Sequence, residues 1–414
     1  MKIRPECGGV ATRRKDGPAL LPGAVDTYPR AMITSPLAHL FILAAVVLGA
    51  VWLEANRRLF RSLGAALVSI LLAMVLSNVG LIPGESPAYD FLAGPAVSAG
   101  IVLILLAVDL RTVVQAGPRM LGAFGVGALG TMAGAATAAF LLSGAIGPET
   151  WKLAGQYTAT YTGGGANFAA VGAALETSGE LFAAGIAADV IVTAVWMATC
   201  LAVPVLWGRG KGGAVPGLEA QTEGPVGSAD ALDRRLYATV GTVSLSDIGG
   251  LTVVVLGTLW AAELLAARTP LPGVLWLTTI ALILAQSRWV RRLRGAAVFG
   301  NYLVLWFLAS NGASSVVANI VAVGPPIFYF ALITVAIHGL VTFVGGSLVG
   351  LDLKTLAVAS QANVGGPASA MALASARGYT DRLLPGVAVG LLGYAVGNYL
   401  GFAVASVARS LMGG

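Results

Sequence analysis

The chain has 414 residues, of which 57% are hydrophobic and only 11% are charged, and its mean hydropathy is +0.83. A soluble domain carries about 25% charged residues, so the composition predicts an integral membrane protein with several crossings. The net charge of +6 does not indicate a nucleic-acid partner, because the basic residues lie between apolar runs. Two cysteines and two histidines are too few for a disulfide framework or a Cys- or His-rich metal centre.

Apolar runs follow a polar N-terminal tail at residues 1–35, and a membrane-spanning helix needs about 20 such residues. The first repeat, 36–206, contains runs at about 36–53, 62–82, 90–108, 120–143 and 181–206, with a glycine-interrupted segment at about 150–178. A cytoplasmic linker at 207–248 carries Gly, Pro and charged residues. The second repeat, 249–408, follows the same plan, with runs at about 249–267, 273–287, 297–317, 323–346 and 383–407 and an interrupted segment at 351–377.

Glycine interrupts one apolar segment in each half, and these interruptions carry most of the functional prediction. The first is Thr162-Gly-Gly-Gly-Ala-Asn167 and the second is Asn363-Val-Gly-Gly-Pro-Ala-Ser-Ala370. Glycine lets a helix stop at little steric cost, and unwound backbone at membrane depth is tolerated only where it is buried or lines a cavity. Gly365 follows Gly164 by 201 positions. We therefore predict two copies of one unit, with chance coincidence as the alternative.

Each interrupted segment is predicted to be a re-entrant hairpin, with a single broken crossing helix as the alternative. An arm of about a dozen residues reaches roughly 18 Å, whereas the hydrocarbon core is about 30 Å thick. Hairpins also keep the arginine-rich loop 288–294 and the linker in the cytoplasm, as the positive-inside rule requires. The predicted fold is an all-α polytopic membrane protein with two inverted repeats of five transmembrane helices, each with a glycine-broken re-entrant hairpin.

Helix ends at the two breaks predict a binding site. N-terminal ends offer N–H groups to an anion, and C-terminal ends offer carbonyl groups to a small cation. The predicted substrate contacts are Thr162, Gly163, Gly164, Gly165, Asn167, Asn363, Gly365, Gly366 and Ser369. Oxygen donors suit a hard monovalent cation, and the predicted Na⁺ ligands are Thr160, Asp189, Thr193 and Gln361. The alternative is that these hydroxyls and amides only satisfy loose backbone groups.

Residues in three other helical runs support further predictions. Asp189 lies deep in the run after the first break, where an ionisable group costs roughly 3 kcal/mol and is a functional candidate by default. His338 is predicted to be a hydrogen-bonded core histidine. Asn398 is predicted to make an interhelical hydrogen bond. Small residues spaced by four let helices approach closely, and they predict packing of the last helix against the second hairpin: Gly386, Gly390, Gly393, Gly397 and Gly401.

At these motifs the sequence resembles a family of bacterial and plastid integral-membrane proteins known as domain of unknown function 819. The residues that carry the resemblance are Thr162 to Asn167, Ala187-Ala-Asp189 with Val192 to Trp196, and Asn363 to Ala370. Val190 departs from the family pattern, which often has Asn there. The family is placed with the cation:proton antiporter and anion transporter superfamily, akin to sodium symporters for glutamate, hydroxycarboxylates and bile acids. The resemblance implies paired hairpins around a midplane site, often with sodium coupling and a dimer, but no substrate.

The predicted function is secondary active transport of a small solute, most simply an organic anion, by alternating access coupled to Na⁺ or H⁺. A passive channel is the alternative, because selectivity filters also use exposed carbonyls. An intramembrane enzyme is disfavoured by the single deep acid and the absence of a Ser–His pair near the breaks. We therefore expect no catalytic residue and no cofactor beyond Na⁺ as coupling ion. Expected partners are the lipid bilayer, a small-molecule substrate and a second copy in a homodimer, at the cell membrane (the bacterial inner membrane) and without nucleic acid.

Overall fold

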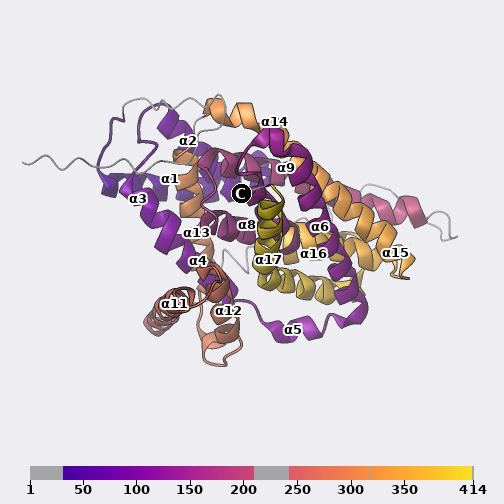
Figure 1. The fold of residues 1–414 in the computed structure, drawn as a ribbon. Coiled ribbons are helices and arrows are strands. Elements are labelled where there is room, and N and C mark those ends of the chain that lie inside the picture. Colours follow the sequence, from indigo (N-terminus) through magenta and orange to yellow (C-terminus); the bar gives the residue numbers. More distant parts are fainter. Residues whose placement is uncertain (1–30, 209–241, 316, 413–414) are drawn as a thin grey trace, which may run out of the picture.

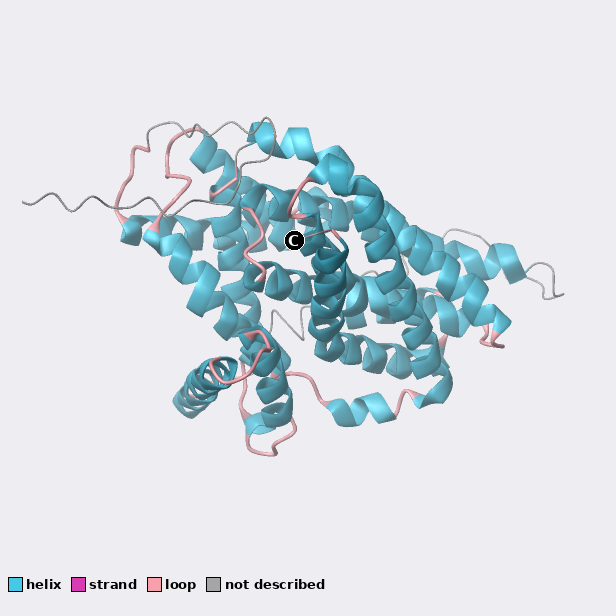
Figure 2. Ribbon diagram, viewed as in Figure 1, coloured by secondary structure: helices cyan, strands magenta, loops and turns pink. Residues whose placement is uncertain are grey.

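The computed structural model describes residues 31–208, 242–315 and 317–412, and the regular structure within these ranges is helical (Figures 1 and 2). Eight helices in this described part are long and apolar enough to cross a membrane: Pro36–Asn56, Pro87–Leu105, Gly117–Ile146, Gly179–Trp207, Leu245–Ala266, Ala296–Ala313, Gly324–Leu348 and Thr380–Leu411. The prediction of an all-helical multi-pass membrane protein is confirmed. Two of the ten expected crossings are shorter apolar helices, Leu63–Asn78 and Gly273–Ala285.

The helices of the two halves follow one another in the same order. The first half contains α1 (Pro36–Asn56), α2 (Arg58–Asn78), α3 (Pro87–Phe91), α4 (Val97–Leu105), α5 (Leu110–Val114), α6 (Gly117–Ile146), α7 (Thr150–Gly163), α8 (Gly165–Ala174) and α9 (Gly179–Gly208). The second half contains α11 (Leu245–Ala266), α12 (Gly273–Ala285), α13 (Ala296–Ala313), α14 (Val317–Gly339), α15 (Gly346–Leu348), α16 (Leu353–Ala376) and α17 (Leu383–Leu411). The predicted tail and most of the predicted linker, 1–30 and 209–241, lie outside the described residues.

Local capping fixes several of the helix starts. Ser244 and Asp247 form a reciprocal capping box at the start of α11, in which each side chain satisfies a backbone N–H that the first turn leaves unpaired. Asp352 caps α16 by accepting from Thr355 N at 3.0 Å. Burial acts to raise the pKa of Asp352, but hydrogen bonds from Thr355 and Arg382 outweigh it and leave the pKa below its usual value.

The described helices pack in two groups, which lie side by side in Figure 1. In the break group, α6 packs on α14, α17 packs on α7 and α16, and α9 packs on α14 and α16. In the flanking group, α13 packs on α2 and α4, α1 packs on α2, and α11 packs on α12. Each group takes helices from both halves of the chain. The sequence does not show which further helices join the interrupted segments and the Asp189 helix, because contacts between segments about 200 residues apart leave no local pattern.

Both predicted interruptions are present, and each falls on a glycine with positive φ. Gly164 has φ 80° and ψ 175°, and it separates α7 from α8. Gly366 has φ 75° and ψ −169°, and it breaks α16 into two arms. Only glycine adopts this backbone conformation without a steric penalty. Pro367 follows Gly366 directly and suits the first turn of the new arm, where its missing N–H costs nothing.

The outer ends of each interrupted segment are joined by hydrogen bonds. Around the first break, Glu149 accepts from Ser178 N at 3.0 Å and Lys152 Nζ donates to Glu176 O at 2.8 Å. Around the second, Arg382 forms an ion pair with Asp352 at 3.2 Å and donates to Thr355 Oγ1 at 3.0 Å. The chain therefore returns, after each break, to the place where the segment began.

Helix α17 packs against both interrupted segments. A methyl group built at Gly386 would stand 2.6 Å from Val358 Cγ1, and one at Gly390 would stand 2.6 Å from Pro367 N, so these glycines face α16. The remaining glycines of the stripe face the first segment: Gly393 meets Thr162, Gly397 meets Asn167 and Gly401 meets Gly155. The predicted packing against the second segment is confirmed for Gly386 and Gly390. The other three glycines pack against the first segment, which the prediction did not include, because the stripe runs the length of the helix.

We expect Gly393→Ala to destabilise the protein by about 1–3 kcal/mol, the usual cost of overpacking. The added methyl group would overlap the carbonyl oxygen of Thr162, which is main chain and cannot rotate away. Thermal unfolding in detergent measures the change. The matched control is Gly122→Ala on α6, where no described atom lies within 4 Å of the new methyl group. Equal stability of the two variants would contradict the close approach.

Candidate functional site

The two breaks lie against one side chain, Tyr394 of α17. A methyl group built at Gly164 would stand 3.2 Å from Tyr394 Cε1, and one built at Gly366 would stand 3.5 Å from its hydroxyl oxygen. Gly164 and Gly366 come from different halves of the chain, and both turn away from helical geometry at this ring. The interrupted segments therefore meet where their backbone is unwound, and Tyr394 separates them.

The arm that leads into the first break carries a row of buried hydroxyls. Thr158, Thr160 and Thr162 are at most 1% exposed, and their Oγ1 atoms have no hydrogen-bond partner within the described residues. A buried hydroxyl without a partner costs roughly 1–3 kcal/mol. Three such hydroxyls are costly as structure alone, which makes them candidates for contact with a ligand or an ion. Two of these residues, Thr160 and Thr162, were predicted as site residues.

The second break has a comparable set of side chains on α16. Gln361 is fully buried, and both its Oε1 and its Nε2 have no partner in the part of the chain that the structure describes. A methyl group at Gly365 would stand 2.6 Å from Gln361 Nε2 and from Ser369 Oγ, so these three predicted site residues are brought together. Asn363 differs, because its amide donates to Phe124 O and Ala359 O at 3.2 Å each.

Asn167 has a structural contact that its predicted role did not include. Its side-chain amide donates to Tyr394 O at 3.2 Å and approaches Gly393 O at 3.5 Å. This contact docks α8 onto α17 beside the break. Gly165, which begins α8, is exposed, whereas Gly163 is buried against Gly393. The first break is therefore accessible on the α8 side and packed on the α7 side.

Asp189 lies midway along α9, which spans Gly179–Gly208. Thr193 Oγ1 donates to its carboxylate at 3.4 Å, as the i+4 spacing predicts. The Tyr161 hydroxyl also approaches the carboxylate, although it does not meet strict hydrogen-bond geometry. Tyr161 lies in the last turn of α7, where its ψ of 17° departs from helical geometry. Three oxygens from two helices thus gather next to the first break, and they are the atoms most suited to hold a cation.

A chain of hydrogen bonds links the two interrupted segments through His338. Ser360 of α16 lies 2.8 Å from His338 Nε2, and Trp196 Nε1 donates to the same serine at 3.0 Å. On the other side of the ring, Nδ1 lies 2.8 Å from Gly127 O and 2.9 Å from Thr131 Oγ1. Thr131 then donates to Tyr161 O at 2.9 Å. The prediction of a hydrogen-bonded core histidine is confirmed. The expected absence of a Ser–His pair near the breaks was wrong, because Ser360 and His338 are separated in sequence but lie in contact.

The partners of His338 fix where the protons lie. A carbonyl oxygen only accepts, so Nδ1 must donate to Gly127 O. In the neutral imidazole Nε2 then carries no proton and accepts from the Ser360 hydroxyl, which itself accepts from the Trp196 indole. The imidazole is neutral in this arrangement, and each hydrogen bond points in one direction from α9 to α7. A second proton on Nε2 would leave Ser360 facing two donors.

Several of these residues were not among the predicted site residues. Tyr394 and Thr131 lie in ordinary apolar helices, and their roles depend on contacts with segments distant in sequence. The glycines on either side of Tyr394 were a usable signal, because they indicate that α17 lies close to other backbone there. Asn398 behaves as predicted and donates to Thr278 Oγ1 at 3.1 Å. Among the described residues, no three His, Cys, Asp or Glu side chains are grouped as metal ligands.

Comparison with known proteins gives matches across both halves of the chain. A family model described as "Protein of unknown function (DUF819)" matches residues 38–411. The chain is also similar to "Uncharacterized membrane protein YjcL" of Bacillus subtilis (strain 168), with 31% identity over 372 residues. That alignment covers 86% of this chain and 92% of the relative. The residues matched by the family model include the positions of the two breaks, Asp189 and His338.

Proposed function

Because the chain belongs to the family described as "Protein of unknown function (DUF819)" and is a multi-pass membrane protein, we propose that it is a secondary active transporter of a small organic anion. Transport is coupled to Na⁺ or H⁺ and runs by alternating access. The same proposal includes kinship with sodium symporters of the cation:proton antiporter and anion transporter superfamily. One observation carries it: two glycine breaks from different halves meet at Tyr394, and the arms that lead into them carry buried polar atoms that have no hydrogen-bond partner among the described residues.

In this proposal each interrupted segment is a re-entrant hairpin. The hydrogen bonds that join Glu149 to Ser178 and the ion pair between Asp352 and Arg382 support it, because they bring the outer ends of each segment together. The arginine distribution requires the two hairpins to enter from opposite faces, which makes the halves inverted repeats. The arms then meet near the middle of the membrane, where inverted-repeat transporters bind their substrates.

Each binding role follows from the chemistry of the residues at the breaks. The arms after Gly164 and Gly366 present helix N-termini, whose dipole and N–H groups favour an anionic group. Thr162 and Ser369 supply hydrogen bonds that orient it. Asp189, Thr193, Thr160 and Gln361 supply oxygens to Na⁺, or Asp189 carries the proton instead. The break group then moves relative to the flanking group and exposes the site to each side in turn.

The test is uptake into proteoliposomes under an imposed Na⁺ or H⁺ gradient, with a panel of small carboxylates and amino acids. We expect saturable accumulation of at least one solute, which collapses when an ionophore dissipates the gradient. Single-channel currents with no accumulation would show a passive channel instead. No accumulation with any solute under either gradient would refute transport as the function.

A further inference from the structure

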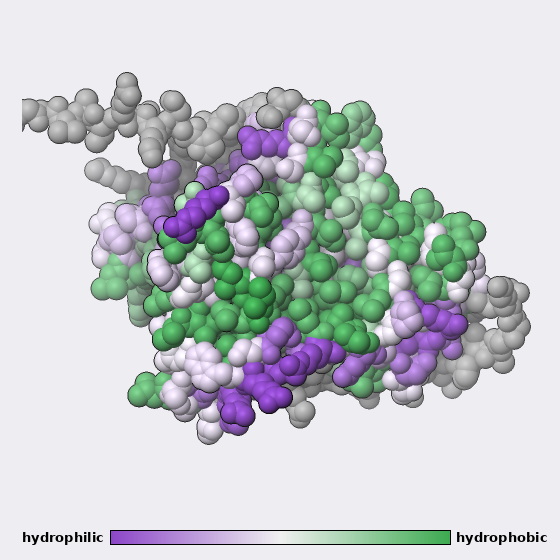
Figure 3. All heavy atoms as spheres, turned by 60° about the horizontal axis from the view of Figure 1, so that its bottom comes forward, coloured by the Kyte–Doolittle hydropathy of each residue, from purple (hydrophilic) through white to green (hydrophobic). Residues whose placement is uncertain are grey.

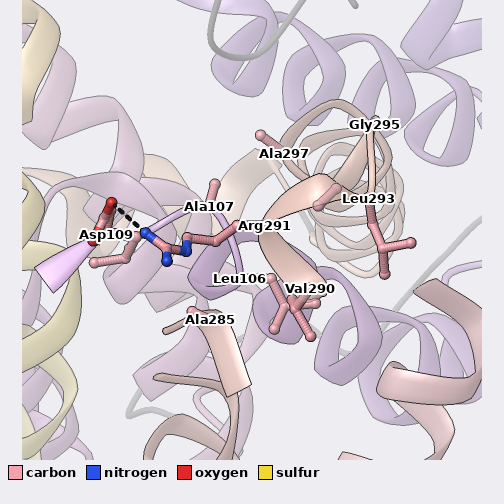
Figure 4. Close-up of a pocket in the computed structure, with 11 residues that line it drawn as sticks. Leu106, Ala107, Asp109, Ala285, Val290, Arg291, Leu293, Gly295 and Ala297 are labelled. Carbon is pink, nitrogen blue, oxygen red and sulfur yellow. Dashed lines mark hydrogen bonds and ion pairs between the residues drawn. The ribbon is translucent and has the colours of Figure 1, made fainter. Parts of the chain in front are cut away.

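A cavity of about 290 Å³ lies outside the break group, where the connection from α4 to α5 meets the connection from α12 to α13 (Figure 4). One wall is residues 106–109 of the first half, and the other is formed within residues 285–297 of the second half. Gln286 joins the walls, because it accepts from Leu110 N and donates to Val108 O, both at 3.1 Å. The cavity is therefore held open by contacts between the two halves of the chain.

Arg291 is the polar group that this cavity offers to a ligand. Its Nη1 donates to Asp109 Oδ2 at 3.2 Å, and Figure 4 shows the guanidinium directed toward that carboxylate. Its Nε is buried and has no hydrogen-bond partner among the described residues. Guanidinium groups bind phosphate oxygens through two parallel N–H donors. The Arg291 side chain lines the cavity and is 26% exposed, so a phosphate group can approach it there.

The rim of the cavity is basic. Arg111, Arg288, Arg292 and Arg294 are exposed and lie within two positions in the sequence of residues that line the cavity. The nearby acids are Asp109 and Asp247, which accepts from Arg294 N. With Arg291, five arginines face two aspartates, so the region keeps an excess of positive charge. Figure 3 shows hydrophilic residues gathered along one edge of the face brought forward from the bottom of Figure 1, beside an apolar surface.

The position of the cavity is that of a lipid headgroup. It lies where α12 ends at Ala285 and α13 begins at Ala296, and Trp289 beside it is 54% exposed. Exposed tryptophan marks the boundary between hydrocarbon and water. Ile283 on α12 and Phe299 on α13 are 66% and 40% exposed, which gives acyl chains an apolar surface next to the cavity.

We propose that this cavity binds the phosphate headgroup of an anionic phospholipid, with the Arg291 guanidinium donating to it and the neighbouring arginines completing the charge. The acyl chains lie along the outer faces of α12 and α13. The arginine-rich loop is predicted to be cytoplasmic, and the cytoplasmic leaflet is where anionic lipids attract basic segments. A lipid bound there bridges the first and second halves within the flanking group, independently of any transported solute.

The experiment uses the full chain, delipidated in detergent, and follows thermal unfolding as phosphatidylglycerol or phosphatidylcholine is added. We expect phosphatidylglycerol to raise the melting temperature and phosphatidylcholine to leave it unchanged. In the double variant Arg291→Gln with Asp109→Asn, the half-saturating phosphatidylglycerol concentration should rise about tenfold or more. Removing both partners avoids leaving one buried charge unpaired.

The control is Arg268→Gln, which removes an exposed arginine from the connection between α11 and α12, at the opposite end of α12. It should not change the half-saturating concentration. If the double variant does not fold, Arg292→Gln is compared with Arg268→Gln for phosphatidylglycerol retained in native mass spectrometry, and only Arg292→Gln should lose it. Equal stabilisation by phosphatidylcholine, equal stabilisation by inorganic phosphate alone, or an equal loss with Arg268→Gln would each overturn the proposal.

Discussion

Substitution of Asp189 by asparagine is expected to abolish the Na⁺-dependent thermal stabilisation of the purified protein. Asp189 is the acid that α9 places beside the first break, with Thr193 Oγ1 3.4 Å away and the Tyr161 hydroxyl near it. A ligand present at 100 times its dissociation constant stabilises a protein by about 2.7 kcal/mol. Asparagine keeps the shape but removes the charge that attracts the cation, so this increment should disappear.

The measurement compares melting temperatures in NaCl and KCl at equal ionic strength. Thr193→Val, which removes a neutral oxygen and keeps the charge, should weaken the Na⁺ effect without abolishing it. Glu180→Gln is the control, because it removes a carboxylate from the first turn of the same helix, outside the Asp189 cluster. A wild-type Na⁺ effect that survives in Asp189→Asn would exclude Asp189 as a ligand. Stabilisation by acid in place of Na⁺ would assign the residue to proton coupling.

The positions of the two breaks could be predicted from the sequence because the cause is local. Only glycine adopts the positive φ of Gly164 and Gly366 without strain, and runs of glycine are conspicuous in an apolar segment. The pairing of Asp189 with Thr193 was predictable for the same reason, since four residues make one turn of a helix. Each of these features depends on a few neighbouring residues, which the sequence displays directly.

The contacts between the two halves could not be predicted in the same way. Tyr394 lies in an apolar helix like several other tyrosines, and its place between the breaks follows from α17 packing against α7 and α16 at once. Asn167 shows the same limit, because its position after a glycine run predicts a ligand contact but does not reveal that its amide donates to the backbone of α17. Residue type and spacing indicate that a polar group has a partner, but only packing decides which one.

We expect His338→Leu to destabilise the protein by about 3 kcal/mol and to uncouple the two interrupted segments. The substitution leaves the Ser360 hydroxyl and the Gly127 carbonyl without their imidazole partner, and an unsatisfied buried group costs about 1–3 kcal/mol. It also cuts the path from Ser360 on α16 to Tyr161 O on α7, through Thr131. Chemical unfolding measures the stability, and Na⁺-dependent stabilisation reports on the site around Tyr161.

His39→Leu provides the matched control, because His39 is also buried and has two partners, Ser86 Oγ at 2.8 Å and Ile33 O at 3.0 Å. It lies on α1 in the flanking group, so its loss should cost comparable stability and leave the Na⁺ effect unchanged.

Ser360→Ala and Trp196→Phe interrupt adjacent hydrogen bonds in the series that runs through His338. The stability cost of the double variant should therefore fall short of the sum of the two single costs by about 0.5–3 kcal/mol. Additive costs, together with an unchanged Na⁺ effect in His338→Leu, would show that the chain only fills the core. Non-additive costs with a lost Na⁺ effect would show that one series of hydrogen bonds fixes the two interrupted segments relative to each other. The neutral imidazole of His338 completes that series.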